Sequence, residues 1–145
     1  LVLCHGNICR SPFAAALLPA RLPNLEVRSA GLQAADGDPA DATAASCAQR
    51  RGISLAAHRS ARVDAESLAW ADLILVMQGA HVAEIASRWP QHRARVRLLG
   101  DFLAGPPYLL PDPWGREEQI FEQVFTRVAE AVERLALRIE TRSTS

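Results

Sequence analysis

The stretch LVLCHGNICRSP at residues 1–12 decides the fold, because a strand, a polar loop and a helix start follow one another directly. The apolar run at 1–3 is typical of a buried strand. Gly6 and Asn7 favour a turn, and Pro12 suits the first turn of a helix. This order predicts a strand–loop–helix unit. Its loop would lie at the carboxyl end of the strand, where parallel sheets bind ligands.

Strand and helix patterns alternate along the rest of the chain. Further strands are expected at 25–30, 73–77 and 96–99, and helices at about 11–19, 40–51, 64–71, 80–88 and 116–138. The pattern predicts an α/β fold, a single domain over residues 1–145 with a four-stranded parallel sheet and helices on both faces. Pro19 is expected to kink or end the first helix, and the polar tail 141–145 is expected to fray.

Composition narrows the class of protein. The 145 residues contain 16 basic and 16 acidic side chains, so the net charge is zero, which argues against a nucleic-acid partner. Every basic residue is Arg. Three cysteines do not make a secreted disulfide framework, and they favour a cytoplasmic enzyme with a reactive thiol.

Neither a membrane-spanning run nor a signal peptide is visible, so no membrane partner is expected. The chain opens without Met, and we expect a natural N-terminus that is longer and extends the first strand.

Cys4, at the end of the first strand, is the candidate reactive group. Backbone N–H groups of the loop and the helix start beyond it would form an anion-binding nest. Arg10, six positions on, can hold two phosphate oxygens at once. That field favours the thiolate form of Cys4. A Walker A loop is excluded because no Lys is present, and a zinc site because Cys4, His5 and Cys9 supply too few well-spaced ligands. Neither metal nor cofactor is expected.

With these residues in place, the segment CHGNICRSP resembles the signature loop of the low-molecular-weight protein tyrosine phosphatases. The resemblance continues in family order along the chain and is closest to the bacterial branch. The matching segments are SAGL at 29–32, PAD at 39–41, GISLAAHRSAR at 52–62, ADLILVM at 71–77 and PDPWG at 111–115.

The resemblance implies hydrolysis of phosphotyrosine in proteins through a phosphocysteine intermediate. Cys4 would be the nucleophile and Arg10 the phosphate clamp, while Asp112 would be the general acid and then the general base. Asp112 lies in the loop 100–115, which contains four prolines and whose length points to function. The phosphate-binding loop would comprise His5, Gly6, Asn7, Ile8, Cys9, Arg10 and Ser11.

Three further roles follow from the same resemblance. Ser11 would donate a hydrogen bond to the thiolate, and it also suits a helix N-cap. Asn7 would hold the unusual backbone of the loop, since Asn tolerates left-handed conformations, and His58 would support Asn7. Cys9 would form a disulfide with Cys4 under oxidation and protect it. Cys47, by contrast, is expected to be inert core.

The substrate pocket departs from the family pattern. Trp114 stands where the family usually carries Tyr, so an aromatic wall remains without its hydroxyl. Leu32 replaces an aromatic of the eukaryotic members and would make the pocket more open and aliphatic. Tyr108 would line or cover the pocket. By resemblance, the expected substrate is an autophosphorylated bacterial tyrosine kinase governing extracellular polysaccharide. The expected assembly is a monomer or weak dimer.

Three alternatives remain on the same residues. Arginine phosphatases of this family carry Thr in place of Ile8, whose branched side chain should crowd a guanidinium. Arsenate reductases that share the loop need two later cysteines, and this chain has none after Cys47. A binding module without turnover would have no need of Cys4, Arg10 and Asp112 together.

Overall fold

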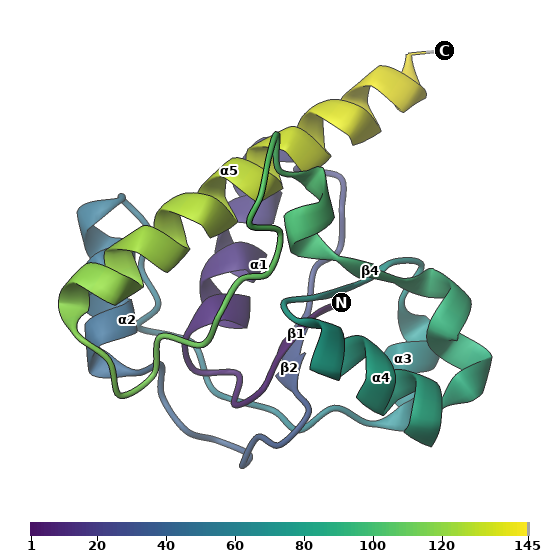
Figure 1. The fold of residues 1–145 in the computed structure, drawn as a ribbon, viewed down its shortest axis with the longest axis horizontal. Coiled ribbons are helices and arrows are strands. Elements are labelled where there is room, and N and C mark those ends of the chain that lie inside the picture. The colour runs from purple at the N-terminus through teal and green to yellow at the C-terminus, as the bar shows by residue number, and fades with distance from the viewer. Residues whose placement is uncertain (145) are drawn as a thin grey trace.

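A four-stranded parallel sheet forms the centre of the computed structural model, which describes residues 1–144 (Figure 1). The strands are short, three residues each, and lie in the order β2-β1-β3-β4. Their bounds are β1 (Val2–Cys4), β2 (Ser29–Gly31), β3 (Ile74–Val76) and β4 (Val96–Leu98). Because β1 and β3 are central, their carboxyl ends meet at the middle of one sheet edge.

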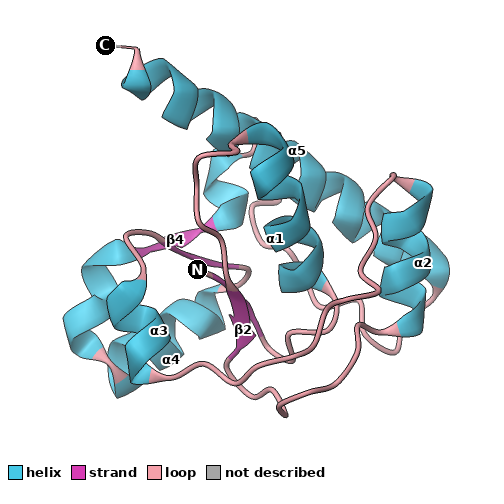
Figure 2. Cartoon of the chain, turned by 180° about the vertical axis from the view of Figure 1, so that it is seen from behind, coloured by secondary structure: helices cyan, strands magenta, loops and turns pink. Residues whose placement is uncertain are grey.

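Helices cover both faces of the sheet, as predicted (Figure 2). The α-helices are α1 (Arg10–Arg21), α2 (Ala42–Arg50), α3 (Ala65–Trp70), α4 (Gly79–Arg88) and α5 (Glu118–Ser143). Two 3-10 helices, η1 (Pro90–Arg95) and η2 (Leu99–Phe102), flank β4. The first, second and fifth α-helices share one core cluster with the sheet, and α4 packs with the end of α3 on the other face.

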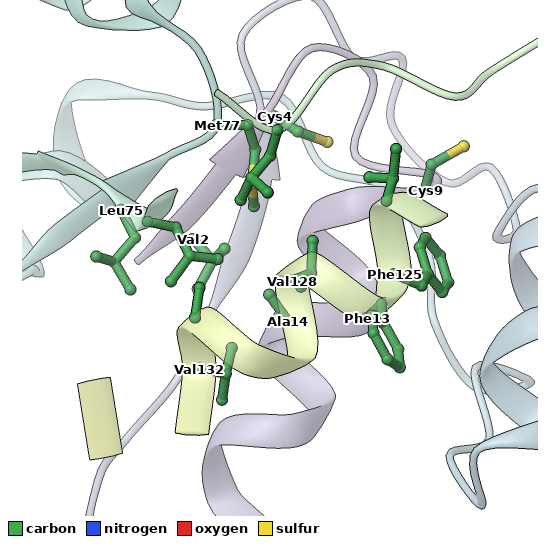
Figure 3. Close-up of a cluster of buried hydrophobic side chains, with 14 of the residues drawn as sticks. Val2, Cys4, Cys9, Phe13, Ala14, Leu75, Met77, Phe125, Val128 and Val132 are labelled. Atoms are coloured by element: carbon green, nitrogen blue, oxygen red, sulfur yellow. The ribbon is translucent and has the colours of Figure 1, made fainter. Parts of the chain in front are cut away.

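The larger core cluster supports the loop that follows β1. Phe13 of α1 stacks on Phe125 of α5 with ring centroids 4.3 Å apart and nearly parallel planes. Cys4 and Cys9 lie at one end of this cluster (Figure 3). The two ends of the loop are therefore anchored in close-packed side chains, which move little.

Several predicted boundaries were wrong. The strand expected at 25–30 narrows to Ser29–Gly31, because β2 is an edge strand and Leu25 is left exposed. Pro19 does not end α1, which continues to Arg21; a proline in the last turn removes one N–H and spares the turns before it. Instead of fraying, α5 continues to Ser143, and Ser145 lies outside the described residues.

Side-chain caps fix the starts of two helices. Asp41 accepts a hydrogen bond from the Ala44 amide at the start of α2, and Asp64 accepts one from Ser67 at the start of α3. Across residues 1–144, we find no helix with the length and apolar character that crossing a membrane requires.

Candidate active site

The loop between β1 and α1 forms the floor of a cavity of about 360 Å³, a size typical of ligand sites. Its walls come from this loop and from the long loop before α5. The lining residues are Cys4, His5, Gly6, Ile8, Cys9, Arg10, Asp112 and Trp114. The three residues predicted to carry the chemistry are thus brought together from β1, α1 and a loop about a hundred residues away.

The sulfur of Cys4 lies within a set of hydrogen-bond donors. Its Sγ is 3.0 Å from Ser11 Oγ and accepts from the Asn7 backbone N–H at 3.3 Å. Ser11 Oγ accepts in turn from Asn7 Nδ2 at 2.8 Å, so its own proton is free to point at the sulfur. Both donors stabilise negative charge on Cys4, and the start of α1 adds its positive end.

Asn7 holds the loop in a strained conformation. Its φ of 56° is in the left-handed region, which Asn enters more readily than most residues. Besides Ser11, Nδ2 donates to Ser29 Oγ at 3.0 Å, and Oδ1 accepts from the Ala61 N–H at 3.0 Å. The fully buried Asn7 side chain thereby connects the loop to β2 and to the segment between α2 and α3, which contains Ala61.

His58 supports Asn7 through the backbone. Its Nε2 is 2.7 Å from the Asn7 carbonyl oxygen, and because a carbonyl accepts, Nε2 carries the proton. Gly31 supports the loop by having no side chain, since a Cβ there would lie 2.8 Å from the His5 carbonyl oxygen and 2.9 Å from the Asn7 nitrogen. The family resemblance of the SAGL segment does not supply this packing reason for Gly31, because the contact forms only in the folded chain.

Arg10 is buried beneath the cavity and held by oxygens from two other segments. Its NH1 donates to Gln78 Oε1 at 2.8 Å and to the Leu110 carbonyl at 2.7 Å. The carboxylate of Asp112 is 3.6 Å from NH2. Within residues 1–144, Arg10 Nε has no hydrogen-bond partner. Sequence analysis missed Gln78 and Leu110, because neither is close to the motif in the chain.

Asp112 is far more open than Cys4 or Arg10, with 40% of its side chain exposed. Its Oδ1 accepts from the Trp114 N–H at 3.1 Å, while Oδ2 faces Arg10. The loop is anchored just before it, where Leu110 is buried and its N–H donates to the Met77 carbonyl at 3.0 Å. Asp112 can therefore exchange protons with solvent and still reach the cavity.

Two predicted pocket residues require correction. Leu32 is 1% exposed and packs in the core cluster on the α4 face, so it does not line the cavity. The alternating direction of side chains around β2 turns it inward. Tyr108 is exposed and also lies off the cavity, and its backbone passes so close over Gly100 that a Cβ there would overlap it. Trp114 and Ile8 do line the cavity.

The other two thiols are held protonated. Burial raises the pKa of the Cys9 thiol far above its usual value, and the charges of Asp41 and Asp112 add to the effect. Burial, together with a hydrogen bond to Glu122, raises the pKa of Cys47 to about 11. Neither thiol is ionised at neutral pH, so each is a poor nucleophile as it stands.

Sequence analysis also assigned no role to His81, which lies behind Gln78. Its Nδ1 accepts from the backbone N–H groups of Met77 and Gln78, both at 3.3 Å. Burial, and then the charge of Arg10, lowers the pKa of His81 to about 4. The imidazole is therefore neutral at physiological pH and fixes the backbone at the end of β3.

Within residues 1–144, one group of side chains has the spacing of a metal site, formed by Cys47, Glu118 and Glu122. Arg50 already neutralises it, with NH2 at 2.5 Å from Glu118 and 2.6 Å from Glu122. The same nitrogen donates to Cys47 Sγ at 3.1 Å. These contacts make the cluster a link between α2 and α5.

Comparison with known protein families agrees with this geometry. The family model described as low molecular weight phosphotyrosine protein phosphatase matches residues 1–144. The low molecular weight protein-tyrosine-phosphatase Etp of Escherichia coli K12 is 39% identical over 139 residues, which cover 96% of this chain and 93% of Etp. A protein-arginine-phosphatase of Geobacillus stearothermophilus is 36% identical over 142 residues, covering 97% and 95%.

Solved structures show the same likeness. The tyrosine phosphatase Wzb from Escherichia coli K30, in complex with sulphate, superposes with a TM-score of 0.91 at 33% identity over 95% of each chain. The YwlE arginine phosphatase from Geobacillus stearothermophilus also gives 0.91, at 34% identity over 99% of this chain and 93% of its own. Both likenesses extend over almost the entire fold.

Proposed function

Since this chain belongs to the low-molecular-weight phosphotyrosine protein phosphatases, hydrolases of phosphotyrosine in proteins, we propose that Cys4, Arg10 and Asp112 carry out the reaction. The observation that carries the assignment is their convergence on one cavity, from β1, α1 and the loop before α5. A binding module would use the buried guanidinium, but it would need neither a buried thiol nor an exposed carboxylate facing the same space.

In the first step, the Cys4 thiolate attacks phosphorus and the bond to the phenolic oxygen breaks, leaving a phosphocysteine. Backbone N–H groups of the loop, the start of α1 and Arg10 stabilise the charge on the equatorial oxygens. Asp112 donates its proton to the departing phenolate. This leaves Asp112 as a carboxylate, and its exposure lets the water of the second step reach it.

In the second step, the Asp112 carboxylate takes a proton from water, and the resulting hydroxide attacks phosphorus. The S–P bond breaks, releasing phosphate and the Cys4 thiolate. Ser11 and the Asn7 N–H stabilise the leaving thiolate through the contacts that they make to its sulfur. Every step uses groups of the chain and one water molecule.

The natural substrate is a tyrosine-phosphorylated protein. By family resemblance, we assign it to an autophosphorylated bacterial tyrosine kinase governing extracellular polysaccharide. That role would place the enzyme in the cytoplasm as a monomer or weak dimer. The corresponding test incubates such a phosphorylated kinase with the parent chain and with Cys4→Ser. We expect the parent alone to remove the phosphate.

The test of the chemistry is hydrolysis of p-nitrophenyl phosphate in excess chelator by the parent chain and by Cys4→Ser. We expect turnover in the parent alone. Equal turnover in both would contradict Cys4 as the nucleophile. If neither chain turned the substrate over while both bound phosphate, the binding-module alternative would be correct.

Hydrolysis of phosphoarginine is the second candidate activity, because a protein-arginine-phosphatase is 36% identical to this chain. Ile8 lines the cavity. By family resemblance, arginine phosphatases carry Thr at this position, and the branched Ile8 side chain should crowd a guanidinium and suit a flat phenol. We expect the parent to prefer phosphotyrosine peptides and Ile8→Thr to shift the ratio of kcat/KM values toward phosphoarginine. A parent that already prefers phosphoarginine would reverse the assignment.

Cys9 is proposed as a redox partner of Cys4. Peroxide would oxidise Cys4 to a sulfenic acid, and the Cys9 sulfur would then displace its oxygen as water, forming a disulfide. Cys9 has to lose its proton in this step, and oxidation of Cys4 removes one of the negative charges that raise the pKa of Cys9. Mass spectrometry after mild peroxide should find a Cys4–Cys9 bond, and sulfinate at Cys4 without that bond would exclude the role.

A further inference from the structure

A second cavity, of about 380 Å³, adjoins the catalytic cavity and shares Asp112 with it. It lies between α5 and the loop 103–117, here called the acid loop, which runs along α5 to its first turn (Figure 1). We call this second cavity the side groove. Its apolar lining comes from Leu109, Leu110 and Pro111 of the acid loop and from Ile120 and Val124 of α5. A molecule bound at Cys4 can therefore extend past Asp112 into the side groove.

Large apolar side chains exposed to solvent are concentrated in the acid loop. Five occur within residues 1–144, and three of them, Tyr108, Leu109 and Trp114, belong to this loop. Leu109 is 50% exposed at the side groove, and Trp114 is 61% exposed at the catalytic cavity. Soluble proteins seldom expose such side chains close together unless the surface binds a partner. Leu109 and Trp114 thus offer apolar surface at both of the cavities that meet at Asp112.

The rim of the side groove is basic. Arg116 and Arg127 line it, and neither forms an ion pair within residues 1–144. Arg127 donates to the backbone carbonyls of Gly105 and Pro107, which orient its guanidinium and leave its charge uncompensated. Among the described residues that line the groove, Asp112 is the acidic one, and its Oδ2 faces Arg10. Two positive charges beside an apolar surface favour a ligand with both an apolar and an acidic side chain.

We propose that the side groove binds the substrate polypeptide next to its phosphotyrosine and selects an apolar side chain with an acidic neighbour. The inference rests on the proposed function, since the phosphotyrosine has to occupy the cavity beside Cys4. An extended polypeptide advances about 3.3 Å per residue, so a side chain about two or three positions from the phosphotyrosine reaches beyond the shared Asp112. Because the groove adjoins the wall that carries Asp112, the selection acts on one side of the phosphotyrosine.

The experiment uses alanine-based peptides that each carry a single phosphotyrosine. Leu is placed in turn at each of the first three positions on either side, and a second set carries Glu or Gln beside the favoured Leu. The kcat/KM of each peptide, divided by that of the all-alanine peptide, gives a preference that does not depend on the absolute rate of a variant. Calorimetry with Cys4→Ser gives the same preference as a ratio of Kd values without turnover. Hydrolysis of p-nitrophenyl phosphate, which ends at its phenol ring, reports on the chemistry separately.

Leu109→Ser removes the exposed apolar side chain of the groove, and Leu137→Ser, on α5 and also 50% exposed, is its matched control. We expect the parent to prefer one Leu peptide about tenfold, as burial of most of a leucine side chain provides. The preference should fall to about threefold in Leu109→Ser and stay at the parental value in Leu137→Ser.

Arg116→Gln removes one charge from the rim, and Arg93→Gln, exposed in η1, is the control for that change. We expect the parent to prefer Glu over Gln about threefold, as for an exposed ion pair, and less at high salt. Arg116→Gln should lose most of this preference, whereas Arg93→Gln should keep it.

A parent that prefers Leu at none of the positions would overturn the proposal, and so would a Leu109→Ser protein that keeps the parental preference. Equal losses in Leu109→Ser and Leu137→Ser would also overturn it, because the effect would then lie outside the groove. If Leu109→Ser changed the sedimentation of the protein and left the peptide preference intact, the groove would be a contact between copies of this chain.

The two proposals can fail separately. A parent that hydrolyses p-nitrophenyl phosphate but shows no preference among the peptides contradicts the side groove alone. A parent that fails to hydrolyse p-nitrophenyl phosphate contradicts the proposed function, and the peptide Kd values still decide whether the groove selects its ligands.

Discussion

The loop that carries Cys4 and the loop that carries Asp112 meet at one cavity but are built in opposite ways. In the first, Cys4, Asn7, Arg10 and Ser11 are all at most 2% exposed, and side-chain hydrogen bonds connect Cys4, Ser11 and Asn7. In the second, Asp112 and Trp114 are largely exposed. The nucleophile and the phosphate site are thus preorganised before substrate arrives, whereas the acid lies where the attacking water can reach it.

The difference follows from the charge that each part has to stabilise. Negative charge on the phosphoryl oxygens and on sulfur is best stabilised by fixed donors that need no rearrangement. The acid must instead be reachable first by the leaving group and then by the attacking water. The acid loop is fastened at a distance from Asp112, through Leu110 and through Arg127, which donates to the Gly105 and Pro107 carbonyls.

Within the exposed loop, removing the acid should have the largest effect on turnover, with little effect on folding. We expect Asp112→Asn to lower kcat about a thousandfold, close to 4 kcal/mol, since general acid–base catalysis contributes 10²–10⁴. The loss should be smaller for substrates with acidic leaving groups. Steady-state kinetics against a series of aryl phosphates measures it, with Asp101→Asn as the exposed control. An equal loss for every leaving group would exclude proton donation by Asp112.

In the buried loop, a single change should disturb folding and turnover together. Asn7→Ala removes three side-chain hydrogen bonds and places Ala at a φ of 56°, so the free energy of unfolding should fall by about 3 kcal/mol. Asn7→Gly allows the same backbone conformation, so its free energy of unfolding should fall less than that of Asn7→Ala. Urea unfolding measures both, with Asn24→Ala as the surface control. A stability change below that of Asn24→Ala would show that the loop does not depend on Asn7.

Acidification should lower the stability of the folded protein through the buried His81 side chain. Its folded-state pKa of about 4 lies below the unfolded value, so the unfolded chain binds more protons between these values and stability falls as pH drops through this window. Replacement by His81→Asn, whose amide oxygen can accept from the same N–H groups, should remove about 2 kcal/mol of the stability difference between pH 7 and 4.5. Chemical denaturation at the two pH values measures it. Identical pH dependence in the variant would rule His81 out as the cause.

The smallest effect is expected at the exposed wall. Trp114→Ala should raise KM for aryl phosphates about fivefold, near 1 kcal/mol, because one aromatic contact with the phenol ring is lost. The phosphate Kd and the melting temperature should stay at parental values. If Trp114→Ala kept the KM of the parent, the substrate ring would not contact Trp114. If its melting temperature fell, Trp114 would contribute to the stability of the fold.

Much of the molecule follows from sequence by itself, since the deciding signals are local. The order of strand, loop and helix at residues 1–12, the caps at Asp41 and Asp64, and the apolar run that forms β3 all lie within a few residues of the structure they specify. They determine an α/β fold with the loop after β1 at a ligand-binding edge. Family resemblance extended this to Asp112, which periodicity cannot identify.

Tertiary structure decided what depends on contacts between distant segments. The end of β2 could not be located by alternation, because its edge position leaves Leu25 without a partner layer. Leu32 was assigned to the pocket, but its direction depends on which face of the sheet it meets. The bonds from Gln78 and Leu110 to Arg10 span 68 and 100 residues, so no spacing in the chain could reveal them. Hydrogen bonds and burial at such separations exist only once the sheet has brought those segments together.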